Sequence, residues 1–223
     1  MGAGGRVAVV IPWRGGCPHR EASLAWLLPR WRRAGHEPIL AEAPPGPWSK
    51  AAAVADGLRH TGADVLVIAD ADVWTGGIPA AVDAVRSGWP WGIPHGDVHR
   101  LDQDATAAVL AGAPLGGGLV QPAYRGFEGG GITVLPRQVY EQVPLDPRYR
   151  GWGQEDESHA LALRTLAGPP WRGDAPLWHL WHPPQARDSR RWGSLASRAL
   201  YRRYRHAAGH PNRTRALLAE MEV

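Results

Sequence analysis

The chain has 223 residues and a formal net charge of +4, with 44% hydrophobic and 21% charged residues. This balance is typical of a globular protein and excludes a disordered one, and the length fits one large domain or two small ones. The single cysteine, Cys17, excludes a disulfide framework and a multi-cysteine metal site. No segment has the about 18 apolar residues of a membrane span, and the N-terminus lacks a signal-peptide pattern. We therefore expect a cytoplasmic protein.

The charge is unevenly distributed along the chain. Residues 1–186 carry 16 Lys and Arg against 18 Asp and Glu, a balance of −2, whereas residues 187–223 carry nine Arg against three acids, a balance of +6. We expect one domain over residues 1–186 and a basic, helical C-terminal extension over 187–223, packed on or next to it. A basic tail favours an anionic partner, such as nucleic acid, a membrane surface or an acidic face of the same protein. A solvated helical face is the alternative.

The first 70 residues alternate between the two kinds of secondary structure. Apolar, β-branched runs predict strands over 6–12, 38–43 and 64–69. Helical spacing of leucines predicts a helix over 20–34, and Ser49 is placed to cap a second helix that runs to residue 60. This order predicts an α/β protein with a Rossmann-like, doubly wound and mostly parallel sheet.

The rest of the chain is richer in glycine and proline and shows fewer regular patterns. We expect helices over 78–87, 104–111, 137–142 and 154–166, and a strand over 131–135. The basic tail predicts one or two helices over 190–205 and 212–220.

Asp70 and Asp72 come directly after the most apolar predicted strand, 64–69. Carboxylates at the carboxyl end of a strand lie where ligands bind in such sheets. Two aspartates at this spacing are suited to holding a divalent cation, which in turn neutralises a diphosphate. An Asp-X-Asp triplet also occurs by chance, and capping of the next turn is the structural alternative.

A second cluster is the sequence Trp178-His-Leu-Trp-His182. His179 and His182 are three residues apart, so on a helical turn they would share a face and chelate one ion. Together with Asp72 they would form a mixed carboxylate and imidazole site, which suits Mn²⁺ or Zn²⁺ better than Ca²⁺. The alternative is a pair of half-buried histidines under two tryptophans.

The third cluster, Gly151-Trp-Gly-Gln-Glu-Asp-Glu157, places three acids in the first turn of a predicted helix. The helix dipole favours negative charge there, which accounts for one or two of them. The Gly-Trp-Gly turn allows close backbone approach and exposes an aromatic plate, and a carboxylate beside it is placed to act as a general base.

These motifs together carry a resemblance to a known family. They follow one another as Ile-Pro-Trp-Arg14, Ser-Lys50-Ala-Ala-Ala, Asp70-Ala-Asp72, Phe127-Glu-Gly-Gly-Gly-Ile-Thr-Val-Leu-Pro-Arg137, Gly-Trp152-Gly-Gln-Glu-Asp156 and His179-X-X-His182. The order resembles the GT-A fold glycosyltransferases over about residues 6–184. It is most similar to the branch with the β-1,4-galactosyltransferases, the chondroitin polymerases and the polypeptide N-acetylgalactosaminyltransferases.

The resemblance implies a role for several residues on the side of a nucleotide-sugar donor, expected to be UDP-linked. Pro12 and Arg14 would line the pocket for its base, and Lys50 and Asp70 would lie near the ribose or the phosphates. Two glycines, Gly130 and Gly131, would lie against the donor sugar.

The resemblance also implies a metal site and a base. Asp72 and His182 would bind Mn²⁺ (or Mg²⁺), with His179 where galactosyltransferases have a methionine ligand. Trp152 and Gly153 would form the acceptor site, Asp156 would deprotonate the acceptor hydroxyl, and Glu155 would contact donor or acceptor sugar. The Glu-Asp pair favours inversion of the anomeric centre.

The sequence departs from the family in two respects. Ala53 or Val54 stands near the place of the asparagine that is usual after the lysine. The stem, membrane anchor and lectin domain of the Golgi enzymes have no counterpart, so we expect a bacterial or phage protein.

Two other functions remain open at this point. A sugar nucleotidyltransferase shares a similar sheet and metal site, but 14–17 only faintly match its glycine-rich loop. A nucleic-acid-binding module would use the arginines and aromatic residues of Arg187–Arg215. The same segment would also serve a glycosyltransferase whose acceptor is hydroxymethylated phage DNA, with a glycan, a lipid-linked sugar or a protein as the other acceptors.

Overall fold

The centre of the fold is built from three apolar strands. We describe a computed structural model that covers residues 5–184 and 193–221. It contains β1 (Val7–Trp13), β3 (Val65–Ala69) and β8 (Ile132–Pro136) side by side, and all five residues of β3 are buried. A strand that is buried on both faces needs apolar side chains at every position, which explains its unbroken apolar run.

The main sheet has six strands in the order β2-β1-β3-β8-β5-β9. Its outer strands are β2 (Ile39–Glu42), β5 (Gly92–Ile93) and β9 (Trp171–Arg172). β1 is parallel to β2 and β3, β8 is antiparallel to β3 and β5, and β9 is parallel to β5. Five strands therefore run in one direction and β8 runs against them, which confirms the mostly parallel sheet.

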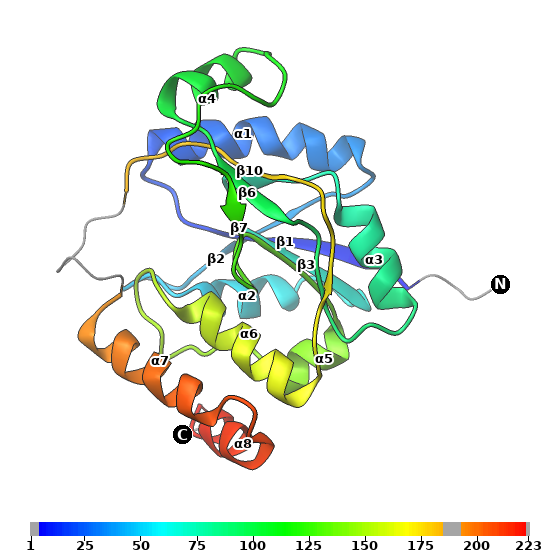
Figure 1. Cartoon of the computed structure of the whole chain (residues 1–223), viewed down its shortest axis with the longest axis vertical. Helices are drawn as coiled ribbons and strands as arrows, with labels where there is room; N and C mark the ends of the chain where they lie inside the picture. Colours follow the sequence, from blue (N-terminus) through cyan, green and yellow to red (C-terminus); the bar gives the residue numbers. More distant parts are fainter. Residues whose placement is uncertain (1–4, 185–192, 222–223) are drawn as a thin grey trace.

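Helices cover both faces of this sheet (Figure 1). Alternate residues of β1 point to opposite sides, so Val9 and Ile11 pack with one set of helices and Val10 with the other. The first set is α1 (Pro18–Arg33) and α3 (Ile78–Arg86). The second set is α2 (Lys50–Leu58), α5 (Arg137–Gln142) and α6 (Glu155–Leu166). The prediction of a doubly wound sheet is confirmed.

A second sheet of four short strands, which the sequence pattern did not predict, lies beside the first. Its order is β4 (Val73–Trp74), β10 (Leu177–His179), β6 (Asp97–Arg100) and β7 (Tyr124–Arg125). The helix α4 (Gln103–Leu110) is near it and packs on α1, where Trp26 Nε1 donates to the Val109 carbonyl at 3.1 Å. Strands of two to four residues are too short to show an alternating pattern.

The basic C-terminal segment folds into α7 (Leu195–Ala207) and α8 (Pro211–Ala219). The start of the helix expected over 190–205, and the boundary expected at residue 186, lie outside the described residues. Leu200, Tyr204 and Leu217 are buried in the same hydrophobic cluster as Leu163 of α6. In Figure 1 these two helices lie beyond α6, at the end of the molecule away from α1 and α4.

One buried carboxylate fastens this segment to the rest of the chain. Asp146 is 4% exposed, and its Oδ2 accepts hydrogen bonds from the Tyr204 hydroxyl at 2.8 Å and from Arg148 Nη2 at 2.7 Å. Arg148 Nη2 also donates to the Leu217 carbonyl at 2.9 Å. The acid therefore holds α7 directly and α8 through the arginine.

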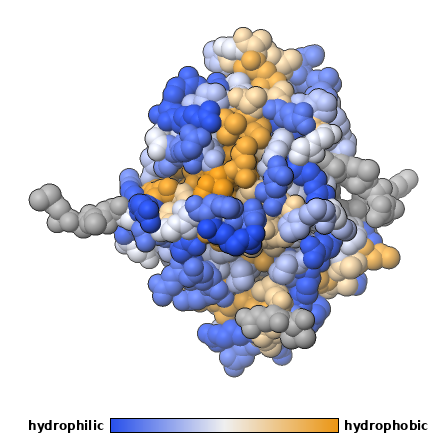
Figure 2. All heavy atoms as spheres, turned by 180° about the vertical axis from the view of Figure 1, so that it is seen from behind, coloured by the Kyte–Doolittle hydropathy of each residue, from blue (hydrophilic) through white to orange (hydrophobic). Residues whose placement is uncertain are grey.

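The surface carries apolar residues among the polar ones. Figure 2 shows, from behind, hydrophobic residues that run from the top of the molecule down to its middle, with hydrophilic residues on either side. Among the exposed large hydrophobic side chains is Phe127, which is 48% exposed. A Cβ built on the neighbouring Gly130 would lie 2.9 Å from its ring, so Phe127 borders a predicted donor residue.

None of the helices in residues 5–184 and 193–221 is both long enough and apolar enough to cross a membrane.

A buried carboxylate, Asp146, and a more exposed one, Asp56, allow a matched test of stability. Asp146→Ala should lower the free energy of unfolding by about 3 kcal/mol or more, because it leaves buried polar partners unpaired. Asp56→Ala removes a more exposed ion pair with Arg59 and should cost less than about 1 kcal/mol. Urea denaturation measures both values, and equal losses would contradict the fastening role of Asp146.

Candidate active site

A backbone pairing between two short strands creates the first part of the site. β4 pairs with β10 in the antiparallel direction, with Val73 opposite His179. Leu180 N then donates to the Asp72 carbonyl at 2.8 Å. Asp72, directly before β4, and the histidines at the end of β10 are brought together by this register, although they lie far apart in the sequence.

Asp72, His179 and His182 form a cluster with the composition of a metal site. One ligand atom from each lies within 4.8 Å of the others. His182 Nε2 is 3.2 Å from Asp72 Oδ2, and His179 Nε2 is 3.9 Å from Asp72 Oδ1. One carboxylate and two imidazoles suit Mn²⁺, so the residues present fit the expected metal.

The hydrogen bonds of the two imidazoles distinguish them as ligands. His182 Nδ1 lies 2.8 Å from the Pro183 carbonyl, which can only accept, so Nδ1 donates, and Nε2 is the ring nitrogen that faces Asp72 Oδ2 at 3.2 Å. Arg100 Nη1 lies 3.2 Å from His179 Nε2 and can only donate, so the lone pair of that nitrogen is already engaged. His182 is therefore the better second ligand beside Asp72.

The electrostatics of this cluster keep both kinds of ligand in their metal-binding form. Burial alone would raise the pKa of Asp72, but His179, His182 and Arg20 together hold it well below its usual range. Burial lowers the pKa of His179 to about 4, and the nearby Arg100 adds to this effect. At neutral pH Asp72 is charged and His179 is neutral.

The structure corrects one expectation about the histidines. They do not lie on a helical turn: His179 is the last residue of β10, and His182 follows in an irregular segment before two prolines. Their ring centroids are nevertheless 5.3 Å apart. The extended chain after β10 therefore brings them together: the two rings do lie side by side, but not through the i, i+3 spacing of a helix.

A second cluster is built around Lys50. Ser49 caps α2 by accepting from Ala52 N at 3.3 Å, and this places Lys50 at the first position of the helix. Lys50 Nζ donates to Asp70 Oδ1 at 2.7 Å and to Asp156 Oδ1 at 2.8 Å. The lysine thus connects the end of β3 with the first turn of α6.

This cluster shifts the pKa of its members in opposite directions. Burial raises the pKa of Asp156 to about 7, and the negative charges of Glu155 and Asp70 add to the rise, while Lys50 opposes it. Burial also raises the pKa of Glu155. Burial alone would lower the pKa of Lys50, but Asp156 and Asp70 hold it above its ordinary value. A carboxyl with a pKa near 7 is suited to proton transfer at neutral pH.

The helix α6 starts one residue later than predicted, and its first acid bonds to the turn before the helix. The helix begins at Glu155, and the residue before it, Gln154, has a left-handed backbone with φ of 70°. Glu155 Oε2 instead accepts from Gly153 N at 2.7 Å. The Gly129 backbone packs so closely on this turn that a Cβ there would lie 2.5 Å from the Asp156 carbonyl.

The two glycines expected at the donor sugar extend this contact to β3. The Gly131 carbonyl accepts from Asp70 N at 2.9 Å, and the Gly131 backbone is left-handed with φ of 78°. His95, which is fully buried, places Nε2 3.3 Å from the Gly130 carbonyl. The glycine segment therefore lies between the Asp70 end of the sheet and the start of α6.

A column of stacked side chains joins the two clusters. The rings of Trp48 and Trp152 stack with centroids 5.7 Å apart, and the Gly151 N donates to the Trp48 carbonyl at 2.8 Å. Arg14 lies 5.4 Å from the Trp48 ring, and Arg20 lies 5.2 Å from the Trp152 ring. Trp152 is therefore half-buried against Trp48 and Arg20 rather than a fully exposed plate.

Most of the residues selected from the sequence thus meet near the carboxyl ends of β1 and β3 in the main sheet. Pro12 is buried in β1 opposite Ala41 of β2, close in sequence to Arg14. The sequence reasoning missed Arg20, Trp48, His95 and Arg100, which contact the selected residues. Only Trp48 carried a signal, since it comes two residues before Lys50 and belongs to the unusual set of 12 tryptophans.

Comparison with known proteins identifies the fold. No family model and no curated protein matches the sequence. Among solved structures, glucosyl-3-phosphoglycerate synthase from Mycobacterium tuberculosis, bound to Mn²⁺, UDP-glucose and phosphoglyceric acid, is 16% identical with a TM-score of 0.53. The match covers 93% of this chain and 80% of that one. GalNAc-T7 with UDP, GalNAc and Mn²⁺ is 13% identical with a TM-score of 0.55, over 90% of this chain and 47% of that one.

These two structures are glycosyltransferases, and the likeness shows that this chain has the GT-A fold, as predicted. At this level of identity it shows the fold alone. The closer similarity to the galactosyltransferase branch, and the roles of the individual residues, stay predictions.

The metal cluster makes a direct prediction. Asp72→Ala and His182→Ala should each weaken Mn²⁺ binding by about tenfold or more, because each removes a ligand from a small set. His179→Ala should have a smaller effect, since Arg100 already engages its Nε2. His99→Ala is the control, because His99 lies on the neighbouring strand against Trp178 and outside the cluster. Titration of Mn²⁺ by electron paramagnetic resonance measures the affinity, and unchanged binding in Asp72→Ala would exclude the site.

Proposed function

We propose that the protein is a metal-dependent glycosyltransferase that transfers a sugar from a nucleoside diphosphate sugar to an acceptor hydroxyl. The observation that carries the proposal is that a possible metal site and a possible general base occur together. The metal site is Asp72 with two histidines, and the base is Asp156, whose pKa is raised to about 7. Arg20 and Trp152 lie between them. The GT-A fold and the Mn²⁺ and UDP-sugar bound to the structural neighbour support it.

Each residue then has a place on the donor side. Asp72 and His182 would hold Mn²⁺ or Mg²⁺, and such a cation supplies charge neutralisation for the leaving diphosphate. Arg14 and Pro12 would border the base, which we expect to be uracil. Lys50 and Asp70 would contact the ribose or the phosphates.

The sugar and the acceptor would meet at the start of α6. Gly130 and Gly131 would lie against the donor sugar, and Trp152 with Gly153 would support the acceptor. Lys50 binds Asp156 Oδ1, so we assign Oδ2 as the atom that takes the proton from the acceptor hydroxyl. The acceptor oxygen then forms its bond to the anomeric carbon while the bond from that carbon to the phosphate oxygen breaks. With a single base and no enzyme nucleophile, this route inverts the anomeric centre; Glu155 would contact a sugar hydroxyl.

Replacing the base separates binding from chemistry. Asp156→Asn should keep Mn²⁺ and donor binding but reduce transfer by about 10²- to 10⁴-fold, the usual contribution of a general base. Transfer is measured as release of nucleoside diphosphate in the presence of acceptor. Full turnover in Asp156→Asn would remove it as the base, and release of pyrophosphate instead would indicate a nucleotidyltransferase.

The raised pKa of Asp156 predicts a pH profile. The base must be deprotonated, so kcat/KM for transfer should fall as the pH drops through about 7 and level off above it. Glu155→Gln removes a negative charge that raises this pKa, and should move the midpoint to lower pH. A midpoint that stays in place in Glu155→Gln would contradict this assignment.

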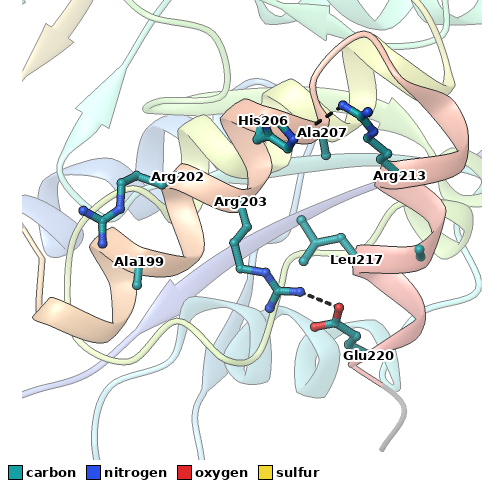
Figure 3. A pocket seen from close by; sticks show the side chains of 9 residues that line it. Ala199, Arg202, Arg203, His206, Ala207, Arg213, Leu217 and Glu220 are labelled. Atoms are coloured by element: carbon teal, nitrogen blue, oxygen red, sulfur yellow. Dashed lines mark hydrogen bonds and ion pairs between the residues drawn. The ribbon is translucent and has the colours of Figure 1, made fainter.

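The basic helices α7 and α8 would bind the acceptor. Between α7 and α8 lies a groove of about 510 Å³, lined by Arg202, Arg203, His206 and Arg213 (Figure 3). Arg203 is paired with Glu220 at 2.5 Å. Residues 193–221 carry six arginines and one acid, so the face attracts anions.

The helix α7, which carries part of this groove, contacts the start of α6 through another side chain. The Tyr201 hydroxyl of α7 donates a hydrogen bond to Glu157 Oε2, one residue after Asp156. A helix of 13 residues is about 20 Å long, so a polyanion along α7 would pass the start of α6. We therefore propose DNA with a hydroxymethylated base as the acceptor, held through its phosphates.

Salt dependence tests this acceptor. The intact chain should bind duplex DNA more weakly as salt rises, and Arg202→Ala and Arg213→Ala should each reduce the logarithmic salt slope by about 1. Arg33→Ala, at the end of α1, is the control and should change nothing. Fluorescence anisotropy measures the affinities. Absence of binding at low salt would exclude DNA and leave a glycan, a lipid-linked sugar or a protein.

A further inference from the structure

Arg20 lies between the two clusters of the site, and none of the roles proposed above is assigned to it. It lies in the first turn of α1, and its side chain is only 18% exposed. Its Nε is 3.3 Å from Asp72 Oδ2, and its guanidinium carbon is 5.2 Å from the centre of the Trp152 ring. The arginine therefore touches a proposed metal ligand and the proposed acceptor floor together.

The contacts of Arg20 leave part of its hydrogen-bonding capacity unused. The Nε atom is buried and has no hydrogen bond of acceptable geometry among the described residues, despite its closeness to Asp72. A buried donor in this state is costly unless another group completes it. Arg30, on the same helix, is the contrast: it lies over the Trp26 ring and donates to the Trp26 carbonyl at 3.0 Å.

We propose that Arg20 is a second cation of the donor site and binds the phosphoryl oxygens of the nucleoside diphosphate beside the metal. A guanidinium keeps its charge at every physiological pH, and its planar set of donors matches phosphate oxygens. The Trp152 ring fixes the orientation of this plane. This inference rests on the proposed function, because it assigns a further residue to the same donor site.

The charges of the site explain how Arg20 could interact with Asp72 and also with a diphosphate. Arg20 Nε lies 3.3 Å from Asp72 Oδ2, so the guanidinium is a counter-ion of this carboxylate. A divalent cation bound to Asp72 would neutralise that carboxylate and weaken its attraction for Arg20, which would leave the guanidinium available to an incoming diphosphate. In this position Arg20 would assist departure of the diphosphate leaving group.

Binding measurements with small probes test this role without needing the true donor. Isothermal titration calorimetry would measure Mn²⁺ alone, then pyrophosphate and inorganic phosphate in the presence of Mn²⁺, on the full chain. Arg20→Ala should bind Mn²⁺ at least as tightly as the wild type, because a competing positive charge is gone. Its affinity for pyrophosphate should fall by about tenfold or more. Arg20→Lys, which keeps the charge but not the planar donors, should lie between the two.

A control variant and the contradicting outcomes separate failure of this inference from failure of the proposed function. Arg30→Ala removes an arginine over a tryptophan from the same helix and should change neither affinity. Unchanged pyrophosphate binding in Arg20→Ala overturns the inference. Loss of Mn²⁺ binding in Arg20→Ala, with unchanged thermal unfolding, also overturns it and makes Arg20 a support for Asp72. Wild-type protein that binds neither Mn²⁺ nor pyrophosphate would remove the proposed function itself.

Discussion

The arrangement of the site depends on the pairing of β4 with β10, which involves two residues of each strand. This short ladder fixes the backbone of Asp72 against that of Leu180, and so places the carboxylate beside the two imidazoles. Arg20 and Arg100 then contact this cluster from α1 and β6. A shift of one residue in this register would turn the side chains to the other face of the strand and separate the ligands.

The same chemical group takes different states in this site because its surroundings differ. Asp72 and Asp156 are both largely buried aspartates, which by itself raises the pKa of a carboxyl. Around Asp72 two imidazoles and a guanidinium outweigh burial and keep the carboxylate charged. Around Asp156 a single lysine is shared with Asp70, and burial prevails. One acid is thereby suited to a cation and the other to a proton.

The sequence predicted the parts of this protein that depend on local patterns. The runs that became β1 and β3, the Ser49 cap and the acidic start of α6 carry their own signal, and motif order brought out Asp72, His182 and Asp156. The second sheet was missed because its strands are short and are stabilised by partners distant in sequence. Arg20 and Arg100 were missed for a related reason. Neither belongs to a sequence motif, and their contacts with the site form only when the chain folds.

Lys50 is the only lysine of the chain, and it is buried in the site with two carboxylates. Every other basic side chain that keeps its charge at neutral pH is an arginine. The outer surface therefore offers no lysine amine for acylation or conjugation. The only side chain that a lysine-directed reagent could modify is Lys50, which is buried in the site. The basic face of α7 and α8 accordingly keeps its positive charge under conditions that would neutralise a lysine-rich surface.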